Sequence, residues 1–142
     1  EYNLMIGDST AEKIKKEIGT AIPSNNNTYA VKGRDLRSGT PKEVNITEED
    51  TAEALNDILK EMVEGIKNAL ESTPPELSAD LVDMGLTLTG GGALLRDLDV
   101  MISEQTGIPV IPADDPLTCV ARGGGVALEI MDKYDIDLLS TD

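Results

Sequence analysis

The most distinctive stretch of the sequence is a run of glycines, Thr89-Gly90-Gly91-Gly92-Ala93, between an apolar segment and an apolar helical pattern. In open α/β sheets, ligands bind where a strand ends and a helix begins. Glycines there would let the backbone approach a nucleotide closely, and the helix N-terminus would add N–H donors. The spacing matches neither the dinucleotide fingerprint nor a phosphate loop followed by Lys. The residues alone leave a ligand-binding turn and a structural tight turn equally open.

A second candidate lies near the start of the chain, where Glu12 and Lys15 are three residues apart in a predicted helix. This spacing places both side chains on one side of the helix, so a carboxylate and an ammonium together could reach a ribose hydroxyl and neighbouring polar atoms. The residues alone favour a simpler alternative, in which Glu12 completes a capping box begun by Ser9 while Lys15 is solvated.

Composition removes several other kinds of chemistry. The chain has no His, which excludes imidazole acid–base catalysis, a Ser–His nucleophile and His-ligated metal within it. Asp114 and Asp115 could suggest Mg²⁺, but a helix cap at Asp115 and solvation explain them more simply, so neither metal ligands nor catalytic residues are predicted. Cys119 is the only Cys, so it forms no disulfide within the chain and fits a reducing cytoplasm.

The charge balance limits the partners. The 142 residues carry 27 acidic and 12 basic side chains, a formal charge of −15 at pH 7. Phosphodiesters and anionic lipid surfaces are bound by clustered Lys and Arg, and so acidic a chain would be repelled by both. Nucleic acid is therefore excluded as the expected partner, whereas protein and small-molecule partners remain. No stretch reaches the roughly 18 uncharged apolar residues that a membrane span needs.

The elements that would position the Glu12–Lys15 pair form an α+β set. Helical spacing of apolar residues predicts a short amphipathic helix over residues 10–18, ended by Gly19 in a left-handed conformation. Residues 1–7 are typical of the last turn of a helix that began upstream. Alternating apolar residues in segments 28–36 and 44–46 predict a β-hairpin around a glycine-containing turn.

A long helix follows the hairpin. Thr47 is its predicted N-cap, and the pair Pro74-Pro75 marks its end. One face carries apolar residues at helical spacing, which indicates that it packs against a core. The opposite face is interpreted as solvated, and it carries Glu48, Glu49, Asp57, Lys60, Glu64 and Lys67.

The glycine run belongs to a different pattern, which begins near residues 70–75. The predicted elements are a short helix over 75–84, a buried strand over 86–89, a helix over 94–102 closed by Gly107, a strand over 109–111, and a helix that starts at Pro116 with Asp115 as its cap. Their order predicts a parallel α/β layer. Gly123-Gly124-Gly125 falls inside the last helix, where glycine is unfavourable, so we expect another segment or a ligand to pack closely against it, and favour another segment.

Four motifs in this order resemble the C-terminal half of the MreB family, the bacterial actin homologues that determine rod shape. The motifs are Glu12-Lys13-Ile14-Lys15, then Gly33-Arg34-Asp35-Leu36 with Gly39-Thr40-Pro41, then Leu88-Thr89-Gly90-Gly91-Gly92-Ala93-Leu94-Leu95, and finally Ala113-Asp114-Asp115-Pro116-Leu117-Thr118-Cys119-Val120-Ala121. The resemblance covers essentially the whole chain and rests on the order and spacing of all four motifs.

The resemblance implies an actin/Hsp70/sugar-kinase fold, which is ribonuclease H-like, with two lobes closing on ATP and Mg²⁺. This chain would belong to the second lobe. Residues 1–72 would form the small outer α+β subdomain, with its hairpin and connecting helix, and residues 73–142 the C-terminal part of the larger inner α/β subdomain, a partial parallel layer.

The resemblance also implies a nucleotide site. Glu12 and Lys15, with Lys13 and Ile14 between them, would contact the ribose and adenine side of ATP or ADP, and Gly90, Gly91, Gly92 and Ala93 would lie under the base and sugar. The family's phosphate loops and its water- and Mg²⁺-orienting carboxylates precede this segment. Because phosphoryl transfer depends on those groups, the isolated segment is expected to be catalytically inert, to bind nucleotide at best weakly and to retain none stably.

Members of the family polymerise into double filaments attached to the inner face of the cytoplasmic membrane. The implied partners are further copies of the protein and the cell-shape and cell-wall synthesis machinery, with no direct membrane contact from this segment. The outer hairpin and the Asn25-Asn26-Asn27 loop would meet the next subunit, and Lys32, Arg34 and Arg37 are candidates for that contact or for an ordinary solvated hairpin. Exposed lobe surface makes self-association or strand exchange of the isolated segment a further expectation.

Two other functions stay open at this stage. The same adenosine motif occurs in actin-fold kinases and chaperone-type ATPases, although the hairpin and the 113–121 stretch favour the MreB family. An interaction module with a vestigial nucleotide site is the third alternative.

Overall fold

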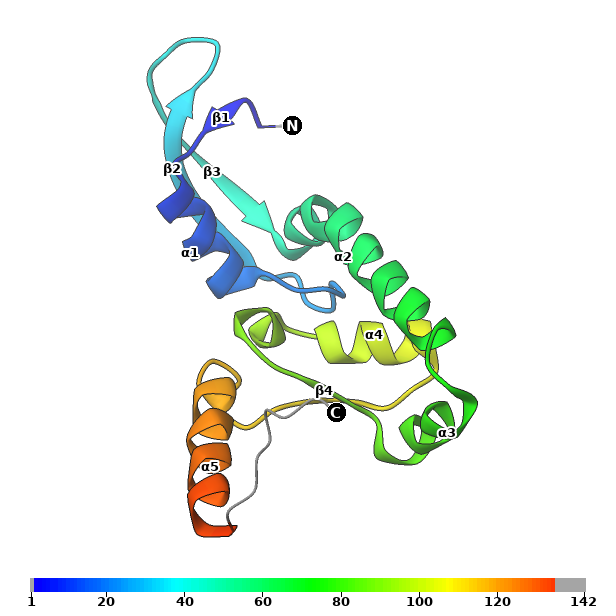
Figure 1. Ribbon diagram of the computed structural model, residues 1–142. Coiled ribbons are helices and arrows are strands. Elements are labelled where there is room, and N and C mark those ends of the chain that lie inside the picture. The colour runs from blue at the N-terminus through cyan, green and yellow to red at the C-terminus, as the bar shows by residue number, and fades with distance from the viewer. Residues whose placement is uncertain (1, 135–142) are drawn as a thin grey trace.

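The computed structural model describes residues 2–134, in which a small antiparallel sheet with its helices is joined by a long helix to a parallel α/β unit (Figure 1). The first part contains β1 (Leu4–Met5), α1 (Asp8–Ile18), β2 (Thr28–Asp35), β3 (Pro41–Thr47) and α2 (Glu48–Glu71). The second contains α3 (Pro75–Met84), β4 (Leu86–Leu88), the 3-10 helix η1 (Gly91–Leu94), α4 (Leu98–Thr106), β5 (Val110–Pro112) and α5 (Cys119–Tyr134).

The start of the chain is a strand, so the prediction of a helical turn over residues 1–7 is wrong; residue 1 itself lies outside the described residues. β1 pairs antiparallel with β2, with Leu4 opposite Asp35 and Met5 opposite Arg34. Gly33 makes this pairing possible, because a Cβ there would lie 2.5 Å from the carbonyl oxygen of Met5. The partner strand, which lies far along the sequence, decides this conformation.

The first helix is confirmed, but its predicted capping box and the predicted left-handed conformation of Gly19 are wrong. Gly19 is extended, with φ −64° and ψ 133°, and leads into the bridge of Thr20 with Arg96. α1 begins two residues early, at Asp8, with Gly7 as N-cap. The carbonyl of Gly7 accepts the N–H groups of Thr10 at 2.9 Å and Ala11 at 3.1 Å. Ser9 therefore lies within the first turn and not at the N-cap position, so Glu12 has no capping box to complete.

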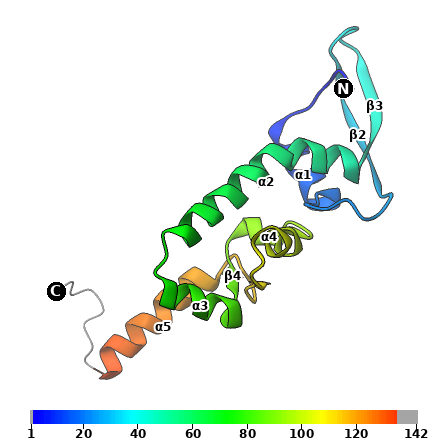
Figure 2. The ribbon, with the colours of Figure 1, turned by 90° about the vertical axis from the view of Figure 1, so that its right-hand side faces the viewer.

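The predicted hairpin and the cap of the long helix are confirmed. β2 and β3 pair antiparallel from Thr28 opposite Thr47 to Arg34 opposite Pro41. The Thr47 hydroxyl accepts the Asp50 N–H at 3.2 Å, while the Asp50 carboxylate accepts the Thr47 N–H at 2.7 Å. This reciprocal capping box lowers the Asp50 pKa, chiefly through the Thr47 N–H. α2 then runs from the sheet towards α3 (Figure 2).

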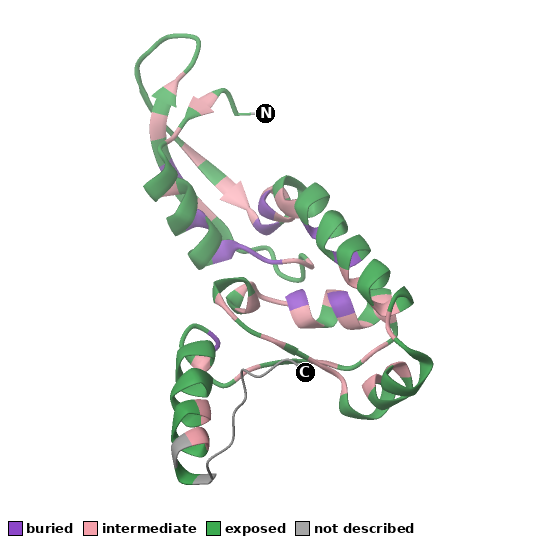
Figure 3. Cartoon of the chain, viewed as in Figure 1, coloured by how far each residue is buried: buried purple, intermediate pink, exposed green. Residues whose placement is uncertain are grey.

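Two apolar clusters hold these elements. Ile14 and Ile18 pack α1 against Val31 of the sheet. The second cluster joins α2 to α4 and contains Leu59, Val63, Leu98 and Ile102. Figure 3 shows the buried segments at these two places, where α1 meets the sheet and where α2 meets α4. The connecting helix is thus part of a core shared by both halves.

The parallel α/β layer is confirmed, with Leu86 opposite Val110 and Leu88 opposite Pro112. β4 is half-buried, however, so the prediction of a buried strand is wrong: Leu86 and Leu88 are both partly exposed, because β4 pairs only with β5 among the described residues. Gly107 ends α4, as predicted, and it does so in the left-handed conformation.

Two predicted helix starts are wrong. The helix expected from Leu94 is interrupted, because Asp97 has a left-handed φ of 60° and α4 begins only at Leu98. The last helix begins at Cys119 and not at Pro116. The Asp115 carbonyl accepts the N–H groups of Thr118 and Cys119, and Asp115 itself has a φ of 49°, so a turn precedes the helix.

The glycine run in α5 shows no close approach. A Cβ built on Gly123, Gly124 or Gly125 meets no atom within 4 Å among the described residues, so the expected packing of another segment is not found there. The same helix exposes Val120, Val126 and Leu128. The predicted inner part of the chain extends to residue 142, and residues 135–142 lie outside the described residues.

Candidate functional site

The Glu12–Lys15 pair of α1 is an ion pair on one side of the helix, as its spacing predicts. Lys15 Nζ lies 2.8 Å from Glu12 Oε2, and Lys16 Nζ lies 3.4 Å from the other oxygen, Oε1. Lys15, and secondarily Lys16, hold the pKa of Glu12 below its ordinary value. Both members stay accessible, with 53% and 48% of the Lys15 and Glu12 side chains exposed. A charged donor and a charged acceptor are therefore presented together.

The two residues between them differ in role. Lys13 is exposed on the surface of α1. Ile14 is 7% exposed and packs with Ile18 and Val31, so its side chain belongs mainly to the core. Of the helix motif, only Ile14 thus belongs to that core, and Glu12 and Lys15 are the two residues that pair with one another.

The glycine turn separates into two parts. Gly90 has φ +80° and ψ −179°, a conformation that side-chain-bearing residues rarely adopt, and its N–H donates to the Pro116 carbonyl at 2.7 Å. Gly91 and Gly92 have no positive φ and are exposed. A Cβ at Gly91 would only touch Leu117 at 3.5 Å, and one at Gly92 would meet nothing within 4 Å among the described residues.

This difference bears on the two readings of the run. The bend explains glycine at position 90, but neither the backbone nor packing within the described residues explains glycine at 91 and 92. The space beside Gly91 and Gly92 is therefore open to a ligand that lies against the backbone. Ala93, the last predicted contact, is half-buried and closes the turn by donating its N–H to the Gly90 carbonyl at 3.2 Å.

The segments that follow the two motifs are joined directly. Thr20 comes just after α1, Arg96 comes just after η1, and the two form a parallel β-bridge. The Ala21 N–H donates to the Arg96 carbonyl at 2.8 Å. The helix motif and the glycine turn are thereby tied to one another at their carboxyl ends.

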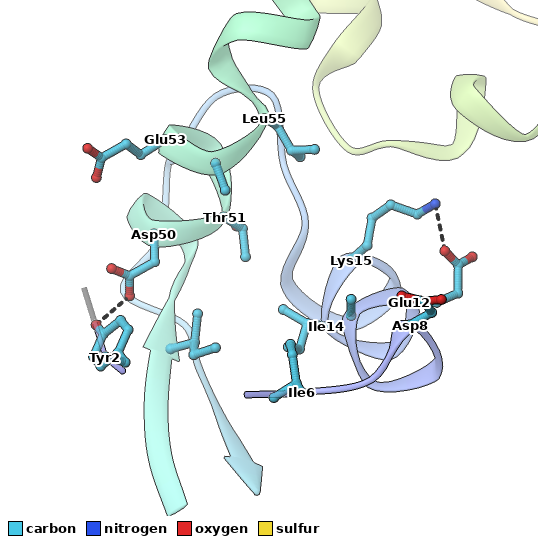
Figure 4. A pocket seen from close by; sticks show the side chains of 13 residues that line it. Tyr2, Ile6, Asp8, Glu12, Ile14, Lys15, Asp50, Thr51, Glu53 and Leu55 are labelled. Atoms are coloured by element: carbon cyan, nitrogen blue, oxygen red, sulfur yellow. Dashed lines mark hydrogen bonds and ion pairs between the residues drawn. The ribbon is translucent and has the colours of Figure 1, made fainter. Parts of the chain in front are cut away.

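A cavity of about 690 Å³ lies between α1 and the start of α2. Glu12, Ile14 and Lys15 contribute to its lining, whereas no residue of the glycine turn does. Figure 4 shows Thr51 of α2 facing this space, the Asp50 carboxylate turned towards Tyr2, and the Glu12–Lys15 ion pair at the far edge. The cavity therefore does not bring the Glu12–Lys15 pair and the glycine turn together.

Sequence reasoning missed a buried polar cluster. Glu48 was assigned to the solvated face of α2, but its side chain is 0% exposed, so this assignment is wrong. The other five members, Glu49, Asp57, Lys60, Glu64 and Lys67, are exposed as predicted. Glu48 differs because the loop before β2 and the side chain of Arg96 cover the first turn of α2. Helical periodicity carries no signal for such remote partners.

Two further observations concern ions and membranes. Within residues 2–134, no group of three or more His, Cys, Asp or Glu side chains is arranged to hold a metal ion. Over the same residues, every helix is too short or too polar to cross a membrane.

Comparison with solved structures identifies the class of fold. The AMPPNP-bound crystal structure of MreB 5 of Spiroplasma citri superposes with a TM-score of 0.89 at 36% identity, over 94% of this chain and 40% of that one. The MamK double helical filament gives a TM-score of 0.73 at 21% identity, over 89% of this chain and 39% of that one, which shows the fold alone. The chain has the fold of part of one lobe of an actin-like protein, and the predicted fold class is confirmed.

Sequence comparison identifies the family. The family described as MreB/Mbl protein matches residues 1–136. The cell shape-determining protein MreB of Escherichia coli K12 is 49% identical over 142 residues, 99% of this chain. The cell shape-determining protein Mbl of Bacillus subtilis is 44% identical over 134 residues, 94% of this chain and 40% of its own length. The chain belongs to the MreB/Mbl family. It spans 41% of the length of the E. coli protein.

Proposed function

We propose that the intact protein is a bacterial actin-like cytoskeletal protein that binds adenine nucleotide between two lobes and polymerises into filaments governing cell shape. Its relatives in the same family are cell shape-determining proteins, and its relatives of known structure include nucleotide-bound proteins. Nucleotide-dependent closure of the lobes would bias the contacts between subunits. The filaments would lie in the cytoplasm at the inner face of the membrane, in contact with the cell-wall synthesis machinery.

In this proposal residues 1–72 form the outer subdomain with its connecting helix, and residues 73–142 form part of the inner subdomain. The chain supplies the adenosine side of the site. Glu12 would accept hydrogen bonds from the ribose hydroxyls, and Lys15 would donate to neighbouring polar atoms of the nucleoside. Gly90 to Ala93 would lie against the base and sugar.

The observation that carries the proposal is the openness of Gly91 and Gly92. Neither position needs glycine for its backbone conformation or for packing within the described residues. The exposed ion pair of Glu12 and Lys15 adds hydrogen-bonding groups suited to a nucleoside. ATP or ADP with Mg²⁺ fits this half of a site on the adenosine side only, because these residues do not supply groups for the phosphates or the metal.

The proposal is tested with the intact protein. We expect ATP with Mg²⁺ to bind, and we expect polymer to pellet on sedimentation with ATP. A protein that binds ATP but stays soluble would favour the kinase or chaperone class, and one that binds no ATP would be an interaction module. The isolated 142-residue segment should bind ATP no more tightly than about 1 mM, or about −4 kcal/mol, because half of the site is missing.

A further inference from the structure

A single buried carboxylate connects three parts of the chain. Glu48, the first residue of α2, is 0% exposed. Its Oε2 accepts the backbone N–H of Asn25 at 3.0 Å, and its Oε1 accepts the side-chain amide of Asn27 at 2.7 Å. The same Oε1 forms an ion pair with Nη2 of Arg96. The carboxylate thus binds the loop before β2 and the segment after the glycine turn at once.

Arg96 continues this network to the end of α1. Its carbonyl accepts the Ala21 N–H at 2.8 Å, and its Nε lies 3.6 Å from Oδ2 of Asp97. The Thr20 side chain is 0% exposed, and its hydroxyl lies 3.0 Å from the same Asp97 oxygen. These polar groups form one cluster, which we call the Glu48–Arg96 junction and which contains Thr20, Asn25, Asn27, Glu48, Arg96 and Asp97.

The Glu48–Arg96 junction contains residues that closely follow the two proposed parts of the nucleoside site, the Glu12–Lys15 pair of α1 and the glycine turn. On one side, Thr20 follows α1 after Gly19, whose N–H donates to the Lys15 carbonyl at 3.0 Å. On the other, Arg96 follows Leu95, whose N–H donates to the Gly92 carbonyl at 3.0 Å. A residue next to the junction is therefore hydrogen-bonded to Lys15, and another is hydrogen-bonded to Gly92.

Burying a carboxylate is unfavourable unless charge and hydrogen bonds compensate it. Burial acts to raise the Glu48 pKa, but the Asn25 N–H, the Asn27 amide and Arg96 outweigh it, so the net pKa is below the ordinary value and the group is ionised. An apolar side chain of similar volume could fill this space with equal stability, but it could not fix the directions of three donors. The arrangement suits a positioning role better than a purely cohesive one.

We propose that Glu48 and Arg96 are positioning residues for nucleotide binding, because their ion pair holds the segment after the glycine turn, which also bridges to the end of α1, against the start of α2. This inference rests on the proposed function. Neither side chain has to touch the nucleotide. Losing the ion pair would let the Glu12–Lys15 pair and the glycine turn shift relative to one another. Ligand affinity falls when the groups that contact a ligand are no longer held in place before it binds.

The experiment measures the dissociation constant of ATP with Mg²⁺ for the intact protein and for Glu48→Gln, Arg96→Gln and the double variant. Each measurement is made well below that variant's melting temperature. We expect each single substitution to raise the dissociation constant of ATP about tenfold or more. The dissociation constant of the double variant should lie within about twofold of that of the weaker-binding single variant, because both substitutions disrupt the same ion pair. Glu43→Gln is the matched control, since it removes an exposed ion pair with Lys32 at 3.4 Å, and it should change affinity by less than about twofold.

A milder variant keeps the test valid if the first two fold poorly. Asn27→Ala removes one hydrogen bond to Glu48 from an exposed residue and leaves the ion pair in place. It should weaken ATP binding by about threefold or more. Variants that melt earlier but bind ATP as tightly as the wild type would show a purely structural role and overturn the inference. Additive losses in the double variant would also overturn it. A wild-type protein that binds no ATP would instead refute the proposed function.

Discussion

Gly91→Val distinguishes a turn that only has to bend from one that lies against a ligand. The folded chain should accept the substitution, because Gly91 is exposed and its φ is not positive. Within residues 2–134, a Cβ at this position meets only Leu117, at the ordinary contact distance of 3.5 Å. We therefore expect the free energy of unfolding without nucleotide to change by no more than about 0.5 kcal/mol.

The effect on nucleotide binding should be much larger. Forcing extra carbons into a close-packed contact costs about 1–3 kcal/mol, which corresponds to a loss of affinity of about 5-fold to 150-fold. Val adds three side-chain carbons at a position where glycine has none, so the loss of affinity should fall near the upper end, at about 100-fold. This magnitude applies only if the base or sugar lies directly on residue 91.

The assay is calorimetric titration of the intact protein with ATP and Mg²⁺, together with thermal melting in the absence of nucleotide. Gly124→Val is the matched control, because position 124 is also an exposed glycine in a run of three, with no atom within 4 Å of a built Cβ among the described residues. Its ATP affinity should match the wild type. If the ATP affinity of Gly91→Val is also within about threefold of that of the wild type, the glycine turn does not contact the nucleotide.

Three further predictions concern stability. Ile102→Ala should lower the free energy of unfolding by about 2–5 kcal/mol in urea titration, since Ile102 is 0% exposed at the centre of the α2–α4 core, and a loss under about 1 kcal/mol would contradict that packing. Thr47→Ala should cost about 1 kcal/mol by removing the α2 cap, whereas the exposed Thr87→Ala should cost less than about 0.5 kcal/mol in the same titration. Because the folded pKa of Asp50 is below the ordinary 3.8, its ionised form stabilises the fold fully above that pH and the contribution is lost as the pH falls through the folded value. Acid titration of Asp50→Asn should accordingly show a shallower loss of stability below about pH 4, and an unchanged slope would mean that the Asp50 contact contributes nothing.

Elements with strong local signals could be predicted from sequence. Thr47 is followed three residues later by Asp50, and this spacing defines the cap of α2 without reference to the rest of the chain. Gly107 ends α4 for an equally local reason, because glycine adopts a left-handed φ readily. The hairpin of β2 and β3 also followed from alternation and a short turn.

The wrong predictions involve partners that lie far along the sequence. Leu4 and Met5 are extended because β2 offers them an edge. The break at Asp97 coincides with the contact of its carboxylate with Thr20, 77 positions earlier. Local periodicity describes neither contact, since each depends on how the whole chain folds back on itself.

The candidate site was predictable to the same extent. The i, i+3 spacing correctly placed Glu12 and Lys15 together, and the ion pair at 2.8 Å follows from helix geometry alone. The sequence did not reveal that Gly90 differs from Gly91 and Gly92, because identical residues carry no information about their φ angles. It also gave no indication that Glu48 is buried.

The core shared by α2 and α4 has a mechanical consequence. Because α2 is held at its first residue by the buried Glu48 carboxylate and along its middle by Leu59 and Val63, it cannot rotate freely relative to α4. The hairpin tip should therefore move together with the parallel strands as one rigid unit, so that a small displacement at the proposed nucleotide site would be accompanied by a larger one at the distant tip.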